Sequence, residues 1–277
     1  NPGNDLLWTE TMAMVNYVTA IEQKTILFPK INYAQYPKEF WASDQWSEAT
    51  KLDWLENYRV FLNQYADLAQ IMKTDGLIIA EPAITYIPAG RSSIDTEAIG
   101  RQFNDEQWDS IIRELHSRYS GQLIGVAYFG SDGAYIPAWL SQMDLIYVFL
   151  SPSLDIQDDT VPAIRQEFDR ILEEVVQPAI TELNKPAIIG ISYPSSPNAW
   201  RGFLLSDPDL SILADGSNSE LSGLELQAKI YSAAIQSASQ HDWIQGFISR
   251  GFFPYLELQD ESSSINKKPA ADILWFW

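Results

Sequence analysis

The 277-residue sequence has no cysteine and only two histidines, His116 and His241. The lack of cysteine excludes disulfides, thiolate zinc sites and a cysteine nucleophile. Two histidines are too few for a multi-histidine metal centre, and a Ser-His-Asp triad would have to use one of them. His116 falls on the polar side of a predicted helix, and His241 precedes a predicted strand. We therefore expect solvated or structural roles for both and no serine hydrolase triad.

Basic residues are also scarce. The 18 Lys and Arg residues stand against 37 Asp and Glu residues, so the formal net charge is −19. This acidity excludes nucleic acids and anionic membrane surfaces as expected partners, because both select for clustered Lys and Arg. No run approaches the roughly 18 apolar residues that a membrane-spanning helix needs. No GxGxxG or GxxxxGK[ST] motif follows an early strand, which argues against a nucleotide-binding open sheet. We expect no cofactor.

Carboxylates and aromatic rings, by contrast, are abundant. The chain has 10 Trp, 13 Tyr and 12 Phe residues, far too many for a disordered segment. Carboxylates perform acid/base and glycosyl-transfer chemistry, and aromatic faces stack on sugar rings. The composition therefore permits a carbohydrate-active protein. The chain begins at Asn1 without a signal-type segment, so we expect targeting information to have been removed. High acidity and the lack of Cys fit a secreted protein, and a cytoplasmic one almost as well; we expect an extracellular or cell-surface location.

Six short apolar runs have the continuous character of parallel strands that are covered on both faces. They are residues 25–29, 77–80, 123–129, 145–150, 187–191 and 244–248. Amphipathic helical stretches separate them, and the clearest has apolar residues at spacings of three and four from Trp54 to Met72. The others span residues 8–22, 108–119, 164–175 and 224–238, and Pro178 is expected to kink or split the helix that precedes it.

This alternation predicts an α/β fold with a parallel sheet. An open doubly wound sheet and a (β/α)8 TIM-type barrel both fit it. A barrel needs eight strands, so we expect its first two to lie upstream of Asn1 and residues 1–277 to form a single, N-terminally incomplete barrel domain. Such a sheet would expose two edges, which predicts association with another chain or domain that supplies the missing strands.

Several stretches resemble clan A glycoside hydrolases, most nearly the β-mannanase-like family 113 and its uncharacterised TIM-barrel relatives. Residues 54–81 are similar to the helix and fourth strand of these proteins. Residues 143–150 are similar to their sixth strand, residues 185–195 to their seventh, and residues 268–277 to their closing helix. The likeness covers roughly residues 8–277. It implies a barrel that binds carbohydrate and hydrolyses a β-linked polysaccharide.

The resemblance implies that Glu81 is the general acid/base at the end of the fourth strand. A carboxylic acid at the C-terminal mouth of a barrel can have a raised pKa and protonate a leaving oxygen. The plainer interpretation is an ordinary loop carboxylate followed by Pro82.

The seventh strand departs from the family pattern. A retaining enzyme needs a second carboxylate about 5 Å from the first. No acid occurs among the matching residues, which are Gly190, Ile191, Ser192 and Tyr193. Three explanations are open: a catalytically inactive barrel that acts as a glycan-binding or cell-surface structural module, a partner acid in the missing strands, or a carboxylate from a loop. The candidates for a loop carboxylate are Asp132, Asp207, Asp209, Asp215 and Glu220.

The loops that follow the strands line the mouth of a barrel, so residues in them are candidates for substrate binding. These residues are Lys30, Asn32, Tyr128, Asp132, Ser192, Tyr193, Trp200 and Arg250. Trp139 and Trp200 could stack on sugar rings or pack onto the protein's own core. Arg250 could pair with Glu81 instead of binding substrate. Residues 206–223 and 262–268 are predicted to be surface loops.

Overall fold

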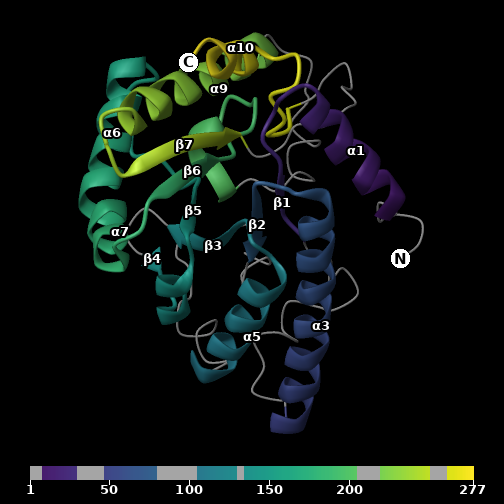
Figure 1. The fold of residues 1–277 in the computed structure, drawn as a ribbon. Helices are drawn as coiled ribbons and strands as arrows, with labels where there is room; N and C mark the ends of the chain where they lie inside the picture. The colour runs from purple at the N-terminus through teal and green to yellow at the C-terminus, as the bar shows by residue number, and fades with distance from the viewer. Residues whose placement is uncertain (1–7, 30–46, 80–104, 130–133, 205–218, 250–260) are drawn as a thin grey trace. The chain divides into compact units, whose positions relative to one another are not determined.

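The computed structural model describes residues 8–29, 47–79, 105–129, 134–204, 219–249 and 261–277 (Figure 1). The chain divides into two units. Unit 1 comprises residues 1–86, 97–126 and 138–145, and unit 2 comprises the remainder. The division passes through strands β3 (Gln122–Phe129) and β5 (Leu145–Leu150). The expected single domain therefore stays a prediction.

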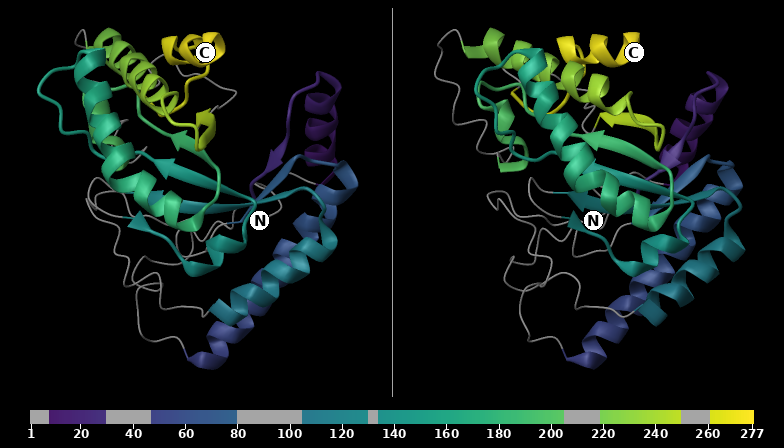
Figure 2. Two further views of the ribbon diagram at one scale, coloured as in Figure 1. Left: turned by 60° about the vertical axis from the view of Figure 1, so that its left-hand side comes forward. Right: turned by 90° about the vertical axis from the view of Figure 1, so that its left-hand side faces the viewer.

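Unit 1 joins parallel strands through long helices. Strands β1, β2 and β3 are neighbours in parallel register, with Ile26 opposite Gly76 and Leu77 opposite Leu123. Helices α3 and α5 run side by side in Figures 1 and 2. The complete elements of this unit are α1 (Trp8–Ala20), β1 (Ile26–Leu27), α3 (Glu48–Met72), β2 (Gly76–Ile79), α5 (Asp105–Arg118) and the 3-10 helix η1 (Ala138–Gln142).

Apolar side chains from these elements make the core of unit 1. Trp108 of α5 stacks on Trp139 of η1, with 4.6 Å between ring centroids. Gly125 lets η1 pack closely on β3, since a Cβ atom there would lie 2.2 Å from Leu140. Trp139 is 2% exposed. Of the two roles considered for Trp139, stacking on a sugar ring and packing onto the core, the structure shows packing onto the core.

Two aspartates in unit 1, each just before a strand, accept hydrogen bonds from backbone N–H groups at the start of the adjacent strand. Asp75, just before β2, accepts a hydrogen bond from the Thr25 backbone N–H at 2.8 Å. Asp144, just before β5, accepts one from the Leu123 backbone N–H, also at 2.8 Å. Each carboxylate satisfies a backbone donor that precedes or begins a strand, where the ladder supplies no partner.

Unit 2 repeats the strand–helix order. Strands β5, β6 and β7 are parallel, with Tyr147 opposite Ile188 and Ile189 opposite Phe247. Helix α9 packs against both α6 and α10 (Figures 1 and 2). Besides β5, the elements are β4 (Ala134–Tyr135), α6 (Val161–Ile171), the π-helical turn η2 (Leu172–Val176), α7 (Gln177–Leu183), β6 (Ala187–Ile191), the 3-10 helix η3 (Ala199–Leu204), α9 (Ser219–Ala238), β7 (Ile244–Ser249) and α10 (Pro269–Phe276).

The six predicted strands are confirmed as β1, β2, β3, β5, β6 and β7, which follow one another in the sheet in chain order. The helix that begins at Val161 is not split at Pro178: α6 passes into the π-helical turn η2 and then into α7, with helical backbone angles at Ile171, Leu172, Val176 and Gln177. The short strand β4 was not expected; it pairs antiparallel with β3. None of the helices in the described segments is long and apolar enough to cross a membrane.

Two predicted surface loops need correction. Residues 219–223 belong to α9 rather than to a loop, whereas residues 206–218 lie outside the described residues. In the segment 262–268, Ser264, Ile265 and Lys268 are buried. The reason is that the Lys268 ammonium group is held inside unit 2 by Ser195 Oγ and the Ser262 carbonyl, both at 2.9 Å.

Candidate functional site

The segments that follow β5 and β6 meet at the C-terminal ends of these strands, in unit 2. Ser151 Oγ, directly after β5, donates a hydrogen bond to the Ser192 carbonyl, directly after β6. Tyr193 Oη donates to the Pro152 carbonyl at 2.8 Å. Gln227 on α9 donates from Nε2 to the Tyr193 carbonyl at 2.8 Å. These bonds fix the start of both segments, which is the edge where a barrel carries its site.

Tyr193 has no exposed side-chain surface. Its ring packs edge-on against Phe168, with centroids 6.1 Å apart. Burial raises the pKa of the Tyr193 phenol well above its ordinary value, and the nearby Glu167 adds to this effect. The phenol therefore keeps its proton as the donor to Pro152. The structure gives Tyr193 a packing role in place of the predicted contact with substrate.

Ser192 and Trp200, two other candidates after β6, are half-buried. The Ser192 backbone carbonyl is occupied by Ser151, and binding of substrate by Ser192 stays a prediction. The Trp200 backbone carbonyl accepts from the Leu154 N–H at 2.8 Å. The guanidinium carbon of Arg201 lies 5.3 Å from the Trp200 ring centroid, within the range of a cation–π contact.

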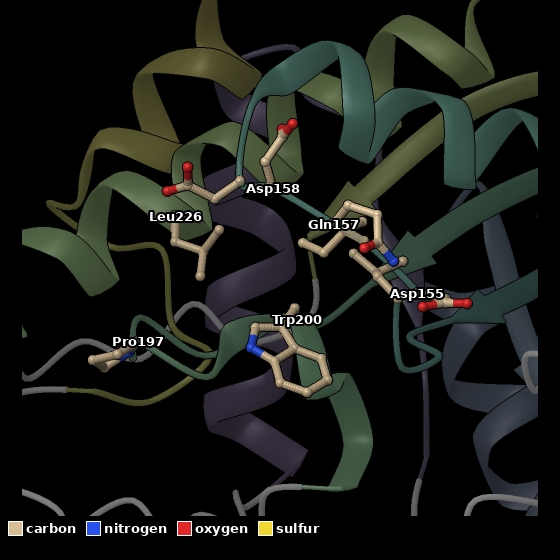
Figure 3. A pocket seen from close by; sticks show the side chains of 9 residues that line it. Asp155, Gln157, Asp158, Pro197, Trp200 and Leu226 are labelled. Carbon is tan, nitrogen blue, oxygen red and sulfur yellow. The ribbon is translucent and has the colours of Figure 1, made fainter.

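Trp200 lines a pocket of about 480 Å³ (Figure 3). This volume lies in the range of about 300–1,000 Å³ typical of small-molecule sites. The segment after β5 forms one wall, and Pro197 and Leu226 contribute apolar surface. The wall consists of Leu154, Asp155, Ile156, Gln157, Asp158 and Asp159. Asp155 and Gln157 were not among the predicted site residues, although both follow a predicted strand, which is the signal that could have found them.

Most of the other predicted site residues lie outside the described residues. These are Glu81, Lys30, Asn32, Asp132 and Arg250. Tyr128 belongs to β3, opposite Tyr135 of β4, and its side chain is not described. The roles of all six stay predictions. Of the carboxylates considered as partners of Glu81, Asp207, Asp209 and Asp215 also lie outside the described residues, and Glu220 lies in the first turn of α9.

No carboxylate follows β6 in the described segment from Ser192 to Leu204. This agrees with the departure from the family pattern that the sequence shows. His116 is exposed, and His241 is half-buried beside Trp243, with ring centroids 5.5 Å apart. Within the described parts of the chain, no group of three or more His, Cys, Asp or Glu side chains is placed to hold a metal ion.

No protein-family model and no curated protein matches the sequence. Solved structures match in fold. The GH113 β-mannanase AaManA from Alicyclobacillus acidocaldarius, in complex with ManMIm, superposes with a TM-score of 0.68 at 17% identity, over 96% of this chain and 76% of that chain. Another GH113 β-1,4-mannanase superposes with a TM-score of 0.67 at 16% identity, over 97% of this chain and 77% of that chain.

Xylanase 10B from Thermotoga maritima gives a TM-score of 0.57 at 11% identity, over 99% of this chain and 80% of that chain. Identities this low carry information on the fold. Together with the parallel strands in chain order, these matches show that the chain has a partial (β/α)8 barrel fold that resembles the clan A glycoside hydrolases.

Proposed function

We propose that this protein is a glycoside hydrolase-like protein that acts on a β-linked polysaccharide, with Glu81 as its general acid/base. The observation that carries the proposal is the position of Glu81 two residues after β2, which ends at Ile79. The fold match supports the proposal, because the matching structures are β-mannanases and a xylanase. An extracellular or cell-surface location follows from such a substrate.

The chemistry asks for a carboxylic acid that is protonated before the bond breaks. A Glu at the mouth of a barrel can be shielded from water, which raises its pKa and lets it protonate the leaving oxygen. A second carboxylate then acts as nucleophile at about 5 Å, or activates water across a gap of about 6.5–9.5 Å. The described part of the segment after β6, from Ser192 to Leu204, contains no such group, so the second acid lies outside it, with Asp207, Asp209 and Asp215 among the candidates.

The test is release of reducing sugar from soluble β-mannan, β-glucan and xylan. We expect the unaltered protein to cleave at least one of them and Glu81→Gln to lose that activity. Glu182→Gln is the matched control, because Glu182 is an exposed carboxylate on α7, and it should cleave like the unaltered protein. Equal activity in Glu81→Gln would refute the role of Glu81.

A second candidate function is a catalytically inactive barrel that binds glycans or serves as a cell-surface structural module. The specific observation that favours it is the lack of a carboxylate between Ser192 and Leu204. This alternative predicts no release of sugar from any substrate, together with retarded migration in gels that contain the same polysaccharides. Cleavage by the unaltered protein that disappears in Glu81→Gln would exclude it.

A further inference from the structure

We propose that the pocket lined by Trp200, Asp155 and Gln157 binds an uncharged saccharide, and we name it the Trp200 pocket. The inference takes its ligand class from the proposed function and does not require Glu81 to be catalytic. It rests on three properties of unit 2: a preformed cavity, a half-buried aromatic ring in its lining, and polar side chains that make no hydrogen bond or ion pair with the described residues.

The Trp200 pocket is built before any ligand arrives, because its acidic wall is anchored at both ends. At one end, the Leu154 N–H donates to the Trp200 carbonyl at 2.8 Å. At the other end, Asp158 Oδ1 accepts from the Thr160 N–H at 3.0 Å, and Thr160 is the N-cap of α6. Asp159 forms an ion pair with Lys229 of α9 at 2.9 Å. An anchored wall loses little conformational entropy on binding, which favours affinity.

These anchors also decide which side chains remain for a ligand. Asp158 is engaged by Thr160, whose hydroxyl and backbone N–H hold the pKa of the carboxyl below its ordinary value. Asp159 is neutralised by Lys229. Among the described residues, the side chains of Asp155 and Gln157 make no hydrogen bond or ion pair, and both are exposed at the pocket. Figure 3 shows both to the right of Trp200 in this view, with the Asp155 carboxylate directed away from the indole ring.

This remaining set matches a sugar. A carboxylate accepts hydrogen bonds from hydroxyl groups, and an amide both donates and accepts, as a polyhydroxylated ring requires. The indole ring and the aliphatic surfaces of Pro197 and Leu226 offer cover for the apolar C–H face of such a ring. Of the three lining carboxylates only Asp159 has a cationic partner, Lys229, and Asp158 stays charged while bonded to Thr160. A cation would compete for Asp155 and Asp158, so the test compares sugars with spermidine.

The test is calorimetric titration of mannotriose, cellotriose and xylotriose into the Glu81→Gln protein, so that hydrolysis cannot consume the ligand. We expect at least one trisaccharide to bind. Adding Trp200→Ala or Gln157→Ala should weaken its binding, by about tenfold for Trp200→Ala. Trp275→Ala is the matched control, because Trp275 is 86% exposed on α10. It should change the dissociation constant by less than about twofold.

Three results would overturn the proposal: no binding of any trisaccharide, equal affinity in Trp200→Ala, or binding of spermidine in preference to the sugars. Trp200→Phe keeps an aromatic ring and should retain binding, which shows that a loss of binding in Trp200→Ala comes from the missing ring and not from misfolding. Reducing-sugar release is measured separately. Hydrolysis by the unaltered protein and its loss in Glu81→Gln test the proposed function. Trisaccharide binding and its loss in Trp200→Ala test the Trp200 pocket, so either claim can fail without the other.

Discussion

The Lys268 Nζ atom donates a hydrogen bond to Ser195 Oγ at 2.9 Å, although the two residues are 73 positions apart. Ser195 lies in the segment after β6, and Lys268 is the residue that precedes α10. Both side chains are buried. The same ammonium group donates to the Ser262 carbonyl at 2.9 Å. A single buried cation thus ties the C-terminal helix to the loop that borders the candidate site.

Lys268→Met should destabilise unit 2 by about 2 kcal/mol, because it removes two hydrogen bonds from a charged donor, one to the buried Ser195 hydroxyl and one to the part-buried Ser262 carbonyl. Lys267→Met is the matched control, since the neighbouring Lys267 is exposed, and it should leave stability unchanged. Urea unfolding followed by circular dichroism measures both variants. Equal midpoints for the two would contradict a structural role for the Lys268–Ser195 contact.

Asp75→Ala should lower stability by about 1 kcal/mol, because the Thr25 N–H loses its carboxylate acceptor. Asp75→Asn keeps a side-chain oxygen as acceptor and should recover most of this loss. Asp53→Ala, at an exposed position on α3, is the control. Thermal unfolding compares the three variants, and a loss in Asp53→Ala as large as that in Asp75→Ala would show that the effect is not specific to the strand.

Glu114 on α5 makes stability depend on pH. Burial acts to raise the pKa of Glu114, but hydrogen bonds from Arg59 and Arg118 outweigh it and hold the pKa below the ordinary 4.5. The folded state therefore binds this proton less tightly than the unfolded chain. The stabilisation is present above about pH 4.5 and is lost as the pH falls through the folded pKa.

Glu114→Gln should flatten this acid loss of stability, whereas Glu106→Gln, an exposed position on the same helix, should retain it. Because about a quarter of the Glu114 side chain is exposed, the contribution is at most about 1 kcal/mol. Urea unfolding between pH 3 and pH 7 measures the slope. Identical slopes in Glu114→Gln and the unaltered protein would argue against this network.

Gly190→Ala should destabilise unit 2, because a Cβ atom on β6 would lie 2.3 Å from Tyr147 Oη on β5. Overpacking of this kind costs about 1–3 kcal/mol. Tyr147→Leu in the Gly190→Ala background removes the obstructing ring and should recover part of the loss. Unfolding midpoints of the single and double variants, compared as a cycle, test this coupling. Additive effects would contradict it.

The sequence predicted the strands and helices well, because burial on both faces leaves continuous apolar runs such as residues 145–150 and one-sided burial leaves stripes such as that from Trp54 to Met72. The sequence did not predict whether side chains in the loops are buried in the core or exposed to solvent. Whether Tyr193 faces a ligand or the core depends on Pro152 and Phe168, which are distant in sequence. Likewise, the burial of Lys268 depends on Ser195, which no local pattern reveals.

The prediction of the site was limited in the same way. Strand ends could be located, so Trp200 was predicted as a site residue after a strand. It lies in η3 and lines a pocket, and its contact with substrate stays a prediction. The wall of that pocket was not predicted, because it depends on contacts with Thr160, Lys229 and the Trp200 carbonyl. The sequence alone does not show which polar loop residues are held by hydrogen bonds or ion pairs, as Asp159 is, and which are not, as for Gln157 among the described residues.

The most direct measurement of the central claim is cleavage of defined β-1,4-linked hexasaccharides of mannose, glucose and xylose, followed by mass spectrometry. The unaltered protein and Glu182→Gln should produce shorter oligosaccharides from at least one hexasaccharide at equal rates. Glu81→Gln should be slower by about a hundredfold or more, the usual contribution of a general acid. Cleavage at the same rate by Glu81→Gln, or no cleavage by the unaltered protein, would contradict the account.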